Sequence, residues 1–106
     1  MVVQSPKTDM IPQNALDEAA VCLKVMAHPV RLQIVDILMN GDFAVHQIAD
    51  QCGVKQHQIC EHLRLMQGHG FLTSTRVGHT VHYKIVSPHL PALVYCIRAI
   101  CGIGSK

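Results

Sequence analysis

Four consecutive side chains, Lys55-Gln56-His57-Gln58, carry ammonium, amide and imidazole groups, which are the donors and acceptors that read base edges and phosphates in DNA. They lead into a helical pattern in which Ile59, Leu63 and Met66 repeat at i, i+4 and i+7. The opposite face then holds Gln56, His57, Cys60 and Arg64. Such a helix meets bases when its first turn enters the major groove. The segment predicts base recognition, and an ordinary solvated helix face remains the alternative.

The residues before this helix fit a helix-turn-helix. Ala49 stands where two helices must cross closely, and Gly53, four residues later, can adopt the left-handed conformation that ends one helix and begins the turn. Ile59 then packs the second helix on the first. Because alanine, glycine and isoleucine are common, these positions alone would also suit an unrelated helical hairpin. The neighbouring elements must therefore decide whether this segment is a helix-turn-helix.

After Gly70 the period changes from helical to alternating. Residues 71–76 are polar and threonine-rich, and Val81, Tyr83 and Ile85 alternate with polar residues as in a β-strand. The two strands flank a turn at residues 77–80, and they must pack on helices because a two-stranded ribbon is only marginally stable alone. We expect the tip of this wing to reach phosphate or the minor groove through Arg76, Gly78, His79 and Thr80.

Further helices are predicted on both sides of these elements. Residues 14–27 have helical spacing that His28-Pro29 interrupts, and a second helix runs from there to Gly41. The last helix begins near Ser87-Pro88 or at Pro91. It carries an apolar stripe of Leu90, Leu93, Val94, Ile97, Ile100 and Cys101, which is too wide for one small core. We expect this stripe to pack on the first helix and on a second subunit.

Together these patterns predict a mainly α fold with a β-hairpin wing (α+β). The architecture is a dimeric winged helix-turn-helix in the order α-α-α-α-β-β-α. Residues 1–12 are expected to be a flexible N-terminal segment, and residues 13–106 the domain, with its first and last helices forming the dimer interface.

Several stretches of the chain resemble the ArsR/SmtB family of winged-helix regulators. They are residues 26–38, Ile59-Cys60-Glu61-His62-Leu63, Gly70-Phe71-Leu72 and residues 76–83, and the likeness covers residues 16–101. The resemblance implies a homodimeric bacterial or archaeal repressor that leaves its double-stranded operator DNA when a metal, a metalloid or a thiol oxidant acts on it. It also places Cys60 where relatives carry a small hydroxyl residue. For His62 it implies either a hydrogen bond at the DNA-facing surface or a role in packing.

The metal-sensing residues that the resemblance implies are mostly replaced in this chain. Relatives of the arsenic and cadmium type carry a cysteine pair where this sequence has Ala44 and His46, so no thiolate pair remains for a soft metal. Relatives of the zinc type carry four ligands where this sequence has Ser87, His89, Ile100 and Ile103. One histidine is not a zinc site. The identity of any metal or metalloid effector, and its ligands, therefore stay unknown.

A third group of relatives senses oxidants or sulfur species through two cysteines. Cys101 matches one of these positions, but the other is Asp36. We expect a different partner for Cys101, either Cys22 or Cys96 of a neighbouring helix, in the same subunit or the other one. Cys96 and Cys101 of one regular helix lie too far apart to form a disulfide. The alternative is that these thiols serve only as small apolar side chains, which is the usual role of free cysteine.

Composition agrees with a small regulator. The chain has 106 residues, enough for one domain, and 49% hydrophobic residues, enough for a core. A net charge of +2 is weak for a DNA-binding protein, and a dimer doubles it. Five cysteines, an odd number, favour reduced thiols. The first twelve residues lack the pattern of a secretory signal, and we find no membrane-spanning apolar stretch. We expect a cytoplasmic protein without a membrane partner.

Two other functional classes are weighed against this prediction. A small metal-dependent enzyme would need a nucleophile with a base or a phosphate-binding glycine loop, and we find neither. His57 and His62 are five residues apart, so they splay around a helix instead of sharing a metal. We therefore expect no catalytic residue and no required cofactor. A winged-helix protein-interaction module without DNA binding is the stronger alternative, because the net charge is low.

Overall fold

The computed structural model describes residues 9–102. Residues 1–8, most of the N-terminal segment predicted to be flexible, and residues 103–106, including Ile103, lie outside the described residues. The helices are α1 (Gln13–Met26), α2 (Pro29–Leu38), α3 (Val45–Cys52), α4 (Gln56–Gly68) and α5 (Leu90–Cys101). The strands are β1 (Phe43–Ala44), β2 (Leu72–Val77) and β3 (Thr80–Ile85). Apart from β1, this order is the predicted one.

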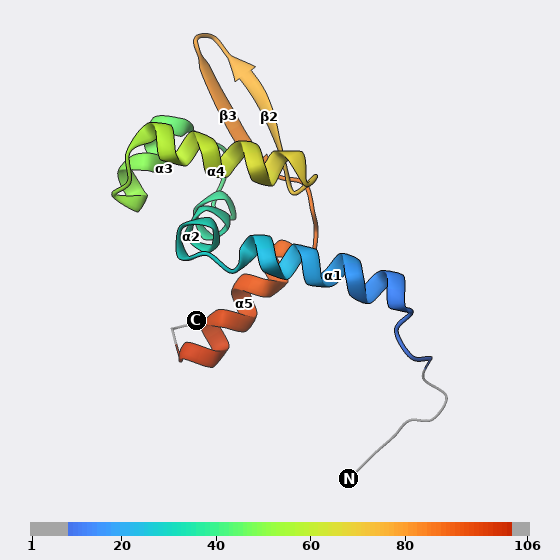
Figure 1. The fold of residues 1–106 in the computed structure, drawn as a ribbon. Helices are drawn as coiled ribbons and strands as arrows, with labels where there is room; N and C mark the ends of the chain where they lie inside the picture. The colour runs from blue at the N-terminus through green and yellow to red at the C-terminus, as the bar shows by residue number, and fades with distance from the viewer. Residues whose placement is uncertain (1–8, 103–106) are drawn as a thin grey trace.

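The elements are arranged around α4. Figure 1 shows the β2–β3 wing projecting on one side of α4, while α2 and then α5 lie on the other side. The core consists of the apolar positions that the sequence periodicity selects, because these are the faces that the helices turn toward one another. Each helix from α1 to α5 contributes to its fully buried side chains, which include Met26, Ile34, Val35, Ile48, Ile59, Leu63, Met66 and Leu90.

The helix-turn-helix forms as predicted. Gly53 has a φ of +67°, and its N–H donates to the carbonyl oxygen of Ala49 at 2.9 Å, so the glycine ends α3 in the left-handed conformation. Ala49 is buried, and Ile59 is completely inaccessible to solvent. Since the close crossing of α3 and α4 and the sharp turn between them are both present, α4 occupies the place of a recognition helix.

The wing is also confirmed, with one addition. Strands β2 and β3 pair antiparallel, and Val77 lies opposite Thr80, so the turn consists of Gly78 and His79. Gly78 has a φ of +64°, which favours glycine at the first position of a two-residue turn. Strand β1, which the sequence pattern did not predict, adds to β3 through Phe43 and gives the sheet order β1-β3-β2. The wing is therefore anchored to the segment that begins α3.

The apolar stripe of α5 divides into two parts. Leu90 and Val94 are buried in the core of their own protomer, and Leu93 and Ile97 are half-buried, so the first part already has a partner. The helix starts at Leu90 with Pro91 in its first turn. Ile100 is 77% exposed, so the far end of the stripe is uncovered in the protomer. No helix within the described residues is long and apolar enough to cross a bilayer.

Candidate nucleic-acid interface

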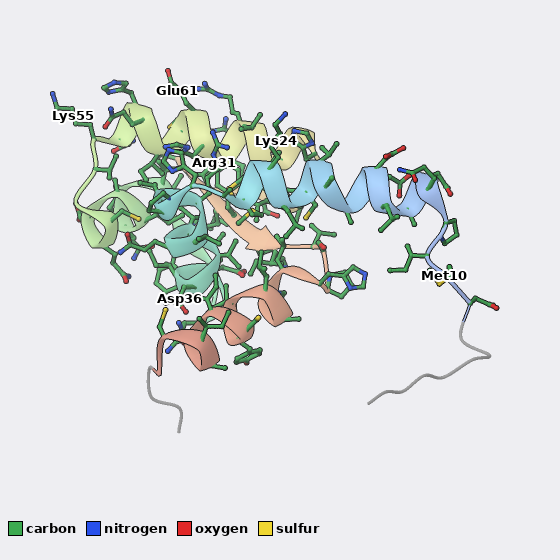
Figure 2. The ribbon with its side chains drawn as sticks, turned by 60° about the horizontal axis from the view of Figure 1, so that its bottom comes forward. Met10, Lys24, Arg31, Asp36, Lys55 and Glu61 are labelled. Atoms are coloured by element: carbon green, nitrogen blue, oxygen red, sulfur yellow. The ribbon has the colours of Figure 1, made fainter. Side chains whose placement is uncertain are left out.

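The first turn of α4 is open to solvent. Lys55, which immediately precedes the helix, and Gln56, His57 and Gln58 within it are all exposed. Arg64, two turns later, is exposed on the same outer side as His57. Figure 2 shows Lys55 at the start of α4, at the edge of the molecule. Amide, imidazole and guanidinium groups are therefore presented together on the surface of the recognition helix.

Glu61 is a surface residue of α4 that the sequence analysis missed. Its side chain is exposed and projects outward from the helix (Figure 2). It lies four residues after His57 and three before Arg64, so the three side chains share one face. A carboxylate there repels phosphate but can accept a hydrogen bond from the amino group of cytosine. The helical spacing, applied to every exposed position and not only to cations and amides, would have identified it.

Two other predicted contacts on α4 point less directly outward. Cys60 is half-buried at the edge of the exposed face. His62 is half-buried and faces the α1–α2 junction, where its Nδ1 accepts a hydrogen bond from Nε of Arg31 at 3.1 Å. The structure thus brings His62 to Arg31 and not to the outer face that His57 and Glu61 share.

At the wing, the predicted residues divide in the same way. Arg76, Gly78 and His79 are exposed at or near the tip. The hydroxyl of Thr80 donates to the carbonyl oxygen of Val77 at 2.9 Å, and it lies 3.1 Å from Nε2 of His82. A hydroxyl has one proton, so the second contact is a hydrogen bond from Nε2 of His82 to the oxygen. Thr80 therefore closes the turn, while Arg76 and His79 are the accessible groups.

The predicted sensing thiols lie in different surroundings. Cys22 is half-buried in a hollow of about 590 Å³ between α1 and the first turns of α5, where Leu90 and Leu93 line the same space. Cys96 and Cys101 are exposed. At a rise of about 1.5 Å per residue, Cys101 lies roughly 12 Å along α5 from Leu93. Within one protomer, α5 therefore carries Cys101 away from Cys22.

The remaining cysteines are Cys52 and Cys60, and all five are free thiols. Burial raises the pKa of the Cys52 thiol, which lowers the fraction of reactive thiolate. Cys52 also packs against the apolar core. It behaves as a small apolar side chain.

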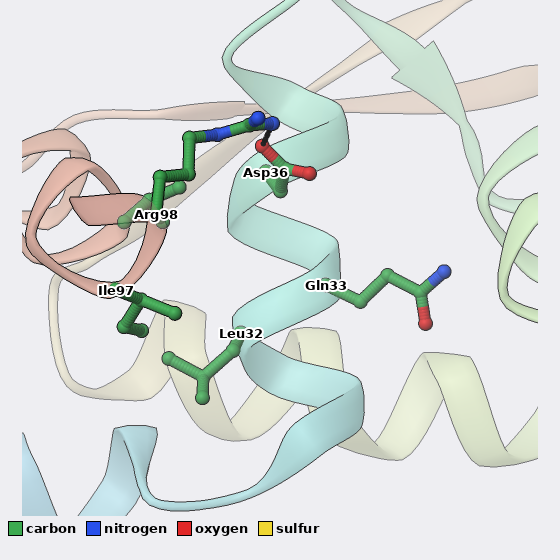
Figure 3. A pocket seen from close by; sticks show the side chains of 6 residues that line it. Leu32, Gln33, Asp36, Ile97 and Arg98 are labelled. Atoms are coloured by element: carbon green, nitrogen blue, oxygen red, sulfur yellow. Dashed lines mark hydrogen bonds and ion pairs between the residues drawn. The ribbon is translucent and has the colours of Figure 1, made fainter. Parts of the chain in front are cut away.

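Asp36, the residue at the other thiol-sensing position, has a charged partner instead of a sulfur. Its Oδ1 lies 2.7 Å from Nη2 of Arg98, and the pair joins α2 to α5 (Figure 3). The two side chains border a hollow of about 300 Å³ whose other walls are Leu32, Gln33, Val94 and Ile97. Because both charges are more than a third exposed, such a pair contributes about 1 kcal/mol or less. It orients the two helices more than it stabilises them.

The described residues contain no group of three or more histidine, cysteine, aspartate or glutamate side chains placed to hold a metal ion. Ala44 is buried and His46 is exposed, at the positions where the arsenic and cadmium type has its thiolates.

Comparison with known proteins agrees with this geometry. A model of the family described as "Bacterial regulatory protein, arsR family" matches residues 28–74. The HTH-type transcriptional repressor SmtB of Mycobacterium tuberculosis is 34% identical over 91 residues, which is 86% of this chain and 67% of the relative.

Solved structures extend the similarity to the whole fold. NolR from Sinorhizobium fredii has a TM-score of 0.79 at 26% identity, covering 98% of this chain and 100% of NolR. The homodimeric winged helix-turn-helix domain of Mb0332 from Mycobacterium bovis has a TM-score of 0.73 at 26% identity, covering 96% of this chain and 91% of that domain. The described fold is thus a winged helix-turn-helix of the same kind.

These findings confirm the resemblance inferred from the sequence. They also decide between the functional classes, since the matched proteins are transcriptional regulators and not enzymes. With a helix-turn-helix, an exposed polar recognition helix and a wing in place, this chain is a DNA-binding transcriptional regulator that belongs to the ArsR family of bacterial regulatory proteins.

Proposed function

We propose that the protein is a cytoplasmic, homodimeric repressor that reads a double-stranded operator with the first turn of α4. The observation that carries this proposal is the joint exposure of Gln56, His57 and Arg64 on one helix beside a wing that exposes Arg76. Amides and imidazoles suit base edges, and guanidinium groups suit phosphates or guanine. Repression is the activity named for the SmtB relative.

The homodimer is supported by apolar side chains that the protomer leaves uncovered. On α1 these are Leu16, Val21 and Leu23, and on α5 they are Tyr95 and Ile100, all at least 43% exposed. The chain has a net charge of only +2, so one protomer attracts DNA weakly. Tight binding therefore requires the two recognition helices of a dimer. The hollow beside Cys22 lies between the same two helices and is almost entirely apolar. A second subunit packed on α1 and α5 buries this surface.

The DNA-binding proposal is tested by measuring duplex affinity as a function of salt. A labelled duplex recovered by selection from a random pool serves as the operator, and a scrambled duplex of the same composition is the reference. We expect tighter binding to the selected duplex and a steep loss of affinity with salt, since lysine and arginine contacts release counterions. Equal, weak binding to both duplexes would contradict the proposal.

Replacing Arg76 by alanine tests the wing. We expect weaker binding to all duplexes and a salt slope smaller by about one unit for each phosphate that is no longer neutralised, hence about two for a symmetric dimer. Arg76 is exposed, so folding should be unaffected. Lys24→Ala, which removes an exposed cation from α1, is the control and should leave the slope unchanged. A slope unaltered by Arg76→Ala would remove the wing from the DNA interface.

For release from DNA we propose a thiol-reactive effector that acts on Cys22, Cys96 or Cys101. In this step two thiols form one disulfide, while hydrogen peroxide takes up their two electrons and two protons and leaves as two waters. Because Cys22 and Cys101 diverge within the protomer, a bond between them would join two subunits across α1 and α5. Such a crosslink would change the spacing of the two recognition helices relative to successive major grooves.

Cys101→Ser tests this switch directly. We expect the unmodified protein to lose operator affinity after peroxide treatment, and the variant to keep it. Cys52→Ser is the matched control, because the Cys52 thiol is held in its less reactive form and its replacement should not alter the response. The measurement is operator binding before and after oxidation, with non-reducing electrophoresis to detect the crosslink. An equal loss of affinity in the unmodified protein and Cys101→Ser would exclude Cys101 and assign the response to another thiol, whereas no loss in either protein would favour a metal effector.

A further inference from the structure

Three side chains from different elements meet beneath the recognition helix. Arg31 of α2 donates from Nε to Nδ1 of His62 on α4 (3.1 Å) and from Nη1 to the carbonyl oxygen of Val25 on α1 (2.9 Å). The ring of His28, in the α1–α2 junction, packs edge-on against the ring of His62 with centroids 4.6 Å apart. Figure 2 places Arg31 between α4 and the end of α1. One guanidinium therefore connects the recognition helix α4 to both α1 and α2.

The direction of these hydrogen bonds fixes the protonation of the two imidazoles. Arginine only donates, so Nδ1 of His62 must be unprotonated, and its single ring proton lies on Nε2. Nδ1 of His28 accepts the backbone N–H of Val30 at 3.2 Å, so it is unprotonated as well and caps the start of α2. A proton added to Nδ1 of His62 would face the Nε proton of Arg31. The bond would then be replaced by repulsion.

We propose that His62 is a positioning residue for DNA binding, which holds α4 in its DNA-reading orientation through Arg31 only while its Nδ1 is unprotonated. The inference rests on the proposed reading of DNA by α4. It assigns to His62 a role other than contacting DNA. Operator affinity falls on acidification because the hydrogen bond from Arg31 to His62, which connects α4 to the α1–α2 junction, is lost.

The surroundings of His62 favour its neutral form. Burial lowers its pKa most, the positive charges that His28 and Arg31 carry or can acquire lower it further, and only Glu61 acts in the opposite direction. Unfolded histidine has a pKa of about 6.5, so the folded protein binds this proton less readily than the unfolded chain. Neutral His62 therefore adds to the free energy of unfolding in full above about pH 6.5, and this contribution is lost as the pH falls below that value. Acidification therefore weakens the hydrogen bond between Arg31 and His62 and lowers the stability of the folded protein.

Histidines on the proposed DNA surface act with the opposite sign. His57 and His79 are exposed on this surface, and a histidine that is protonated there adds a positive charge near phosphate. That gain strengthens binding to any duplex, whatever its sequence. The effect of His62 must therefore be measured as the difference between two proteins with the same surface histidines.

His62→Asn provides this difference, because its amide oxygen lies near the position of Nδ1 and accepts from Arg31 but does not titrate. Affinity for the selected duplex is compared at about pH 7.5 and pH 5.5, on either side of the histidine range. We expect the unmodified protein to lose roughly three- to tenfold more affinity than His62→Asn on acidification, the size of one hydrogen bond. His69→Asn is the matched control, since His69 lies exposed just beyond α4 and stacks on Phe71 instead. It should keep the pH profile of the unmodified protein.

Equal pH profiles for the unmodified protein and His62→Asn, in proteins that bind the duplex, would overturn the inference and leave the proposed function intact. Absence of duplex binding in the unmodified protein would overturn the proposed function itself. A measurement without DNA completes the test. Nitrogen chemical shifts of the His62 ring should show the proton on Nε2 and titration below the range of an exposed histidine, whereas a proton on Nδ1 at neutral pH would contradict the inference.

Discussion

Leu23→Glu is expected to convert the protein from a dimer into a monomer that no longer binds operator DNA. Leu23 is 54% exposed and lines the apolar hollow between α1 and α5, so the protomer loses little when it is replaced. In a two-fold dimer the substitution occurs twice, and each unpaired carboxylate in a desolvated interface costs about 3–5 kcal/mol. Dimer affinity should therefore fall by on the order of ten-thousandfold or more.

Val77→Glu is the matched control for this experiment. Val77 is also 54% exposed, but it lies at the end of β2 in the wing, far from α1 (Figure 1). Sedimentation at micromolar concentration should give a dimer for the unmodified protein and for Val77→Glu, and a monomer for Leu23→Glu. A monomeric unmodified protein would refute the dimer, and a dimeric Leu23→Glu would exclude this part of α1 from its interface.

The sequence predicted those parts of the fold in which a residue type or an apolar period allows only one local conformation. Gly53 and Gly78 both adopt positive φ, where a side chain is strained, so each turn could be placed to the residue. His28-Pro29 interrupts the helical pattern because proline has no N–H to continue it, and α2 does begin at Pro29. The apolar period of α4 likewise selected Ile59, Leu63 and Met66, all fully buried.

Strand β1 and the division of the α5 stripe were beyond the reach of the sequence for a common reason. A two-residue strand has no period, and Phe43 and Ala44 pair with β3 only because the chain brings them there. Periodicity also gives the direction of a helix face but not its partner. It therefore grouped Leu90 and Val94, which the protomer buries, with Ile100, which it leaves exposed.

The same limit applies to the candidate site. Residue types indicated that Gln56 and His62 can both bind DNA, but only tertiary structure shows that His62 faces Arg31 and leaves Gln56 exposed. The partner of Arg31 lies 31 positions away in the chain, a separation that no local pattern encodes. Asp36 and Arg98, 62 positions apart, were missed as a pair for the same reason. Exposure and long-range contacts are products of packing, so they decide which candidates remain available to DNA.

Among these candidates, Gln56 and His57 are expected to determine sequence preference. The double variant Gln56→Ala/His57→Ala should lose affinity for the selected duplex by about 1–3 kcal/mol for each side chain that reads a base. Affinity for the scrambled duplex should change much less, because the lysine and arginine side chains that attract phosphate are unchanged. Competition binding with the two duplexes measures the ratio of the affinity for the selected duplex to that for the scrambled duplex. A tenfold or larger fall in that ratio corresponds to about 1.4 kcal/mol.

Gln67→Ala is the control for this last experiment, since it removes the same amide group from the other end of α4. Gln67 is exposed and donates to the hydroxyl of Ser74 at 3.2 Å, so its side chain is engaged with β2 and not with the first turn of the helix. Its replacement should leave the ratio between the two duplexes unchanged. A loss of equal size on both duplexes after Gln56→Ala/His57→Ala would assign these side chains to the phosphate backbone, and base reading would then have to come from Glu61 and Arg64.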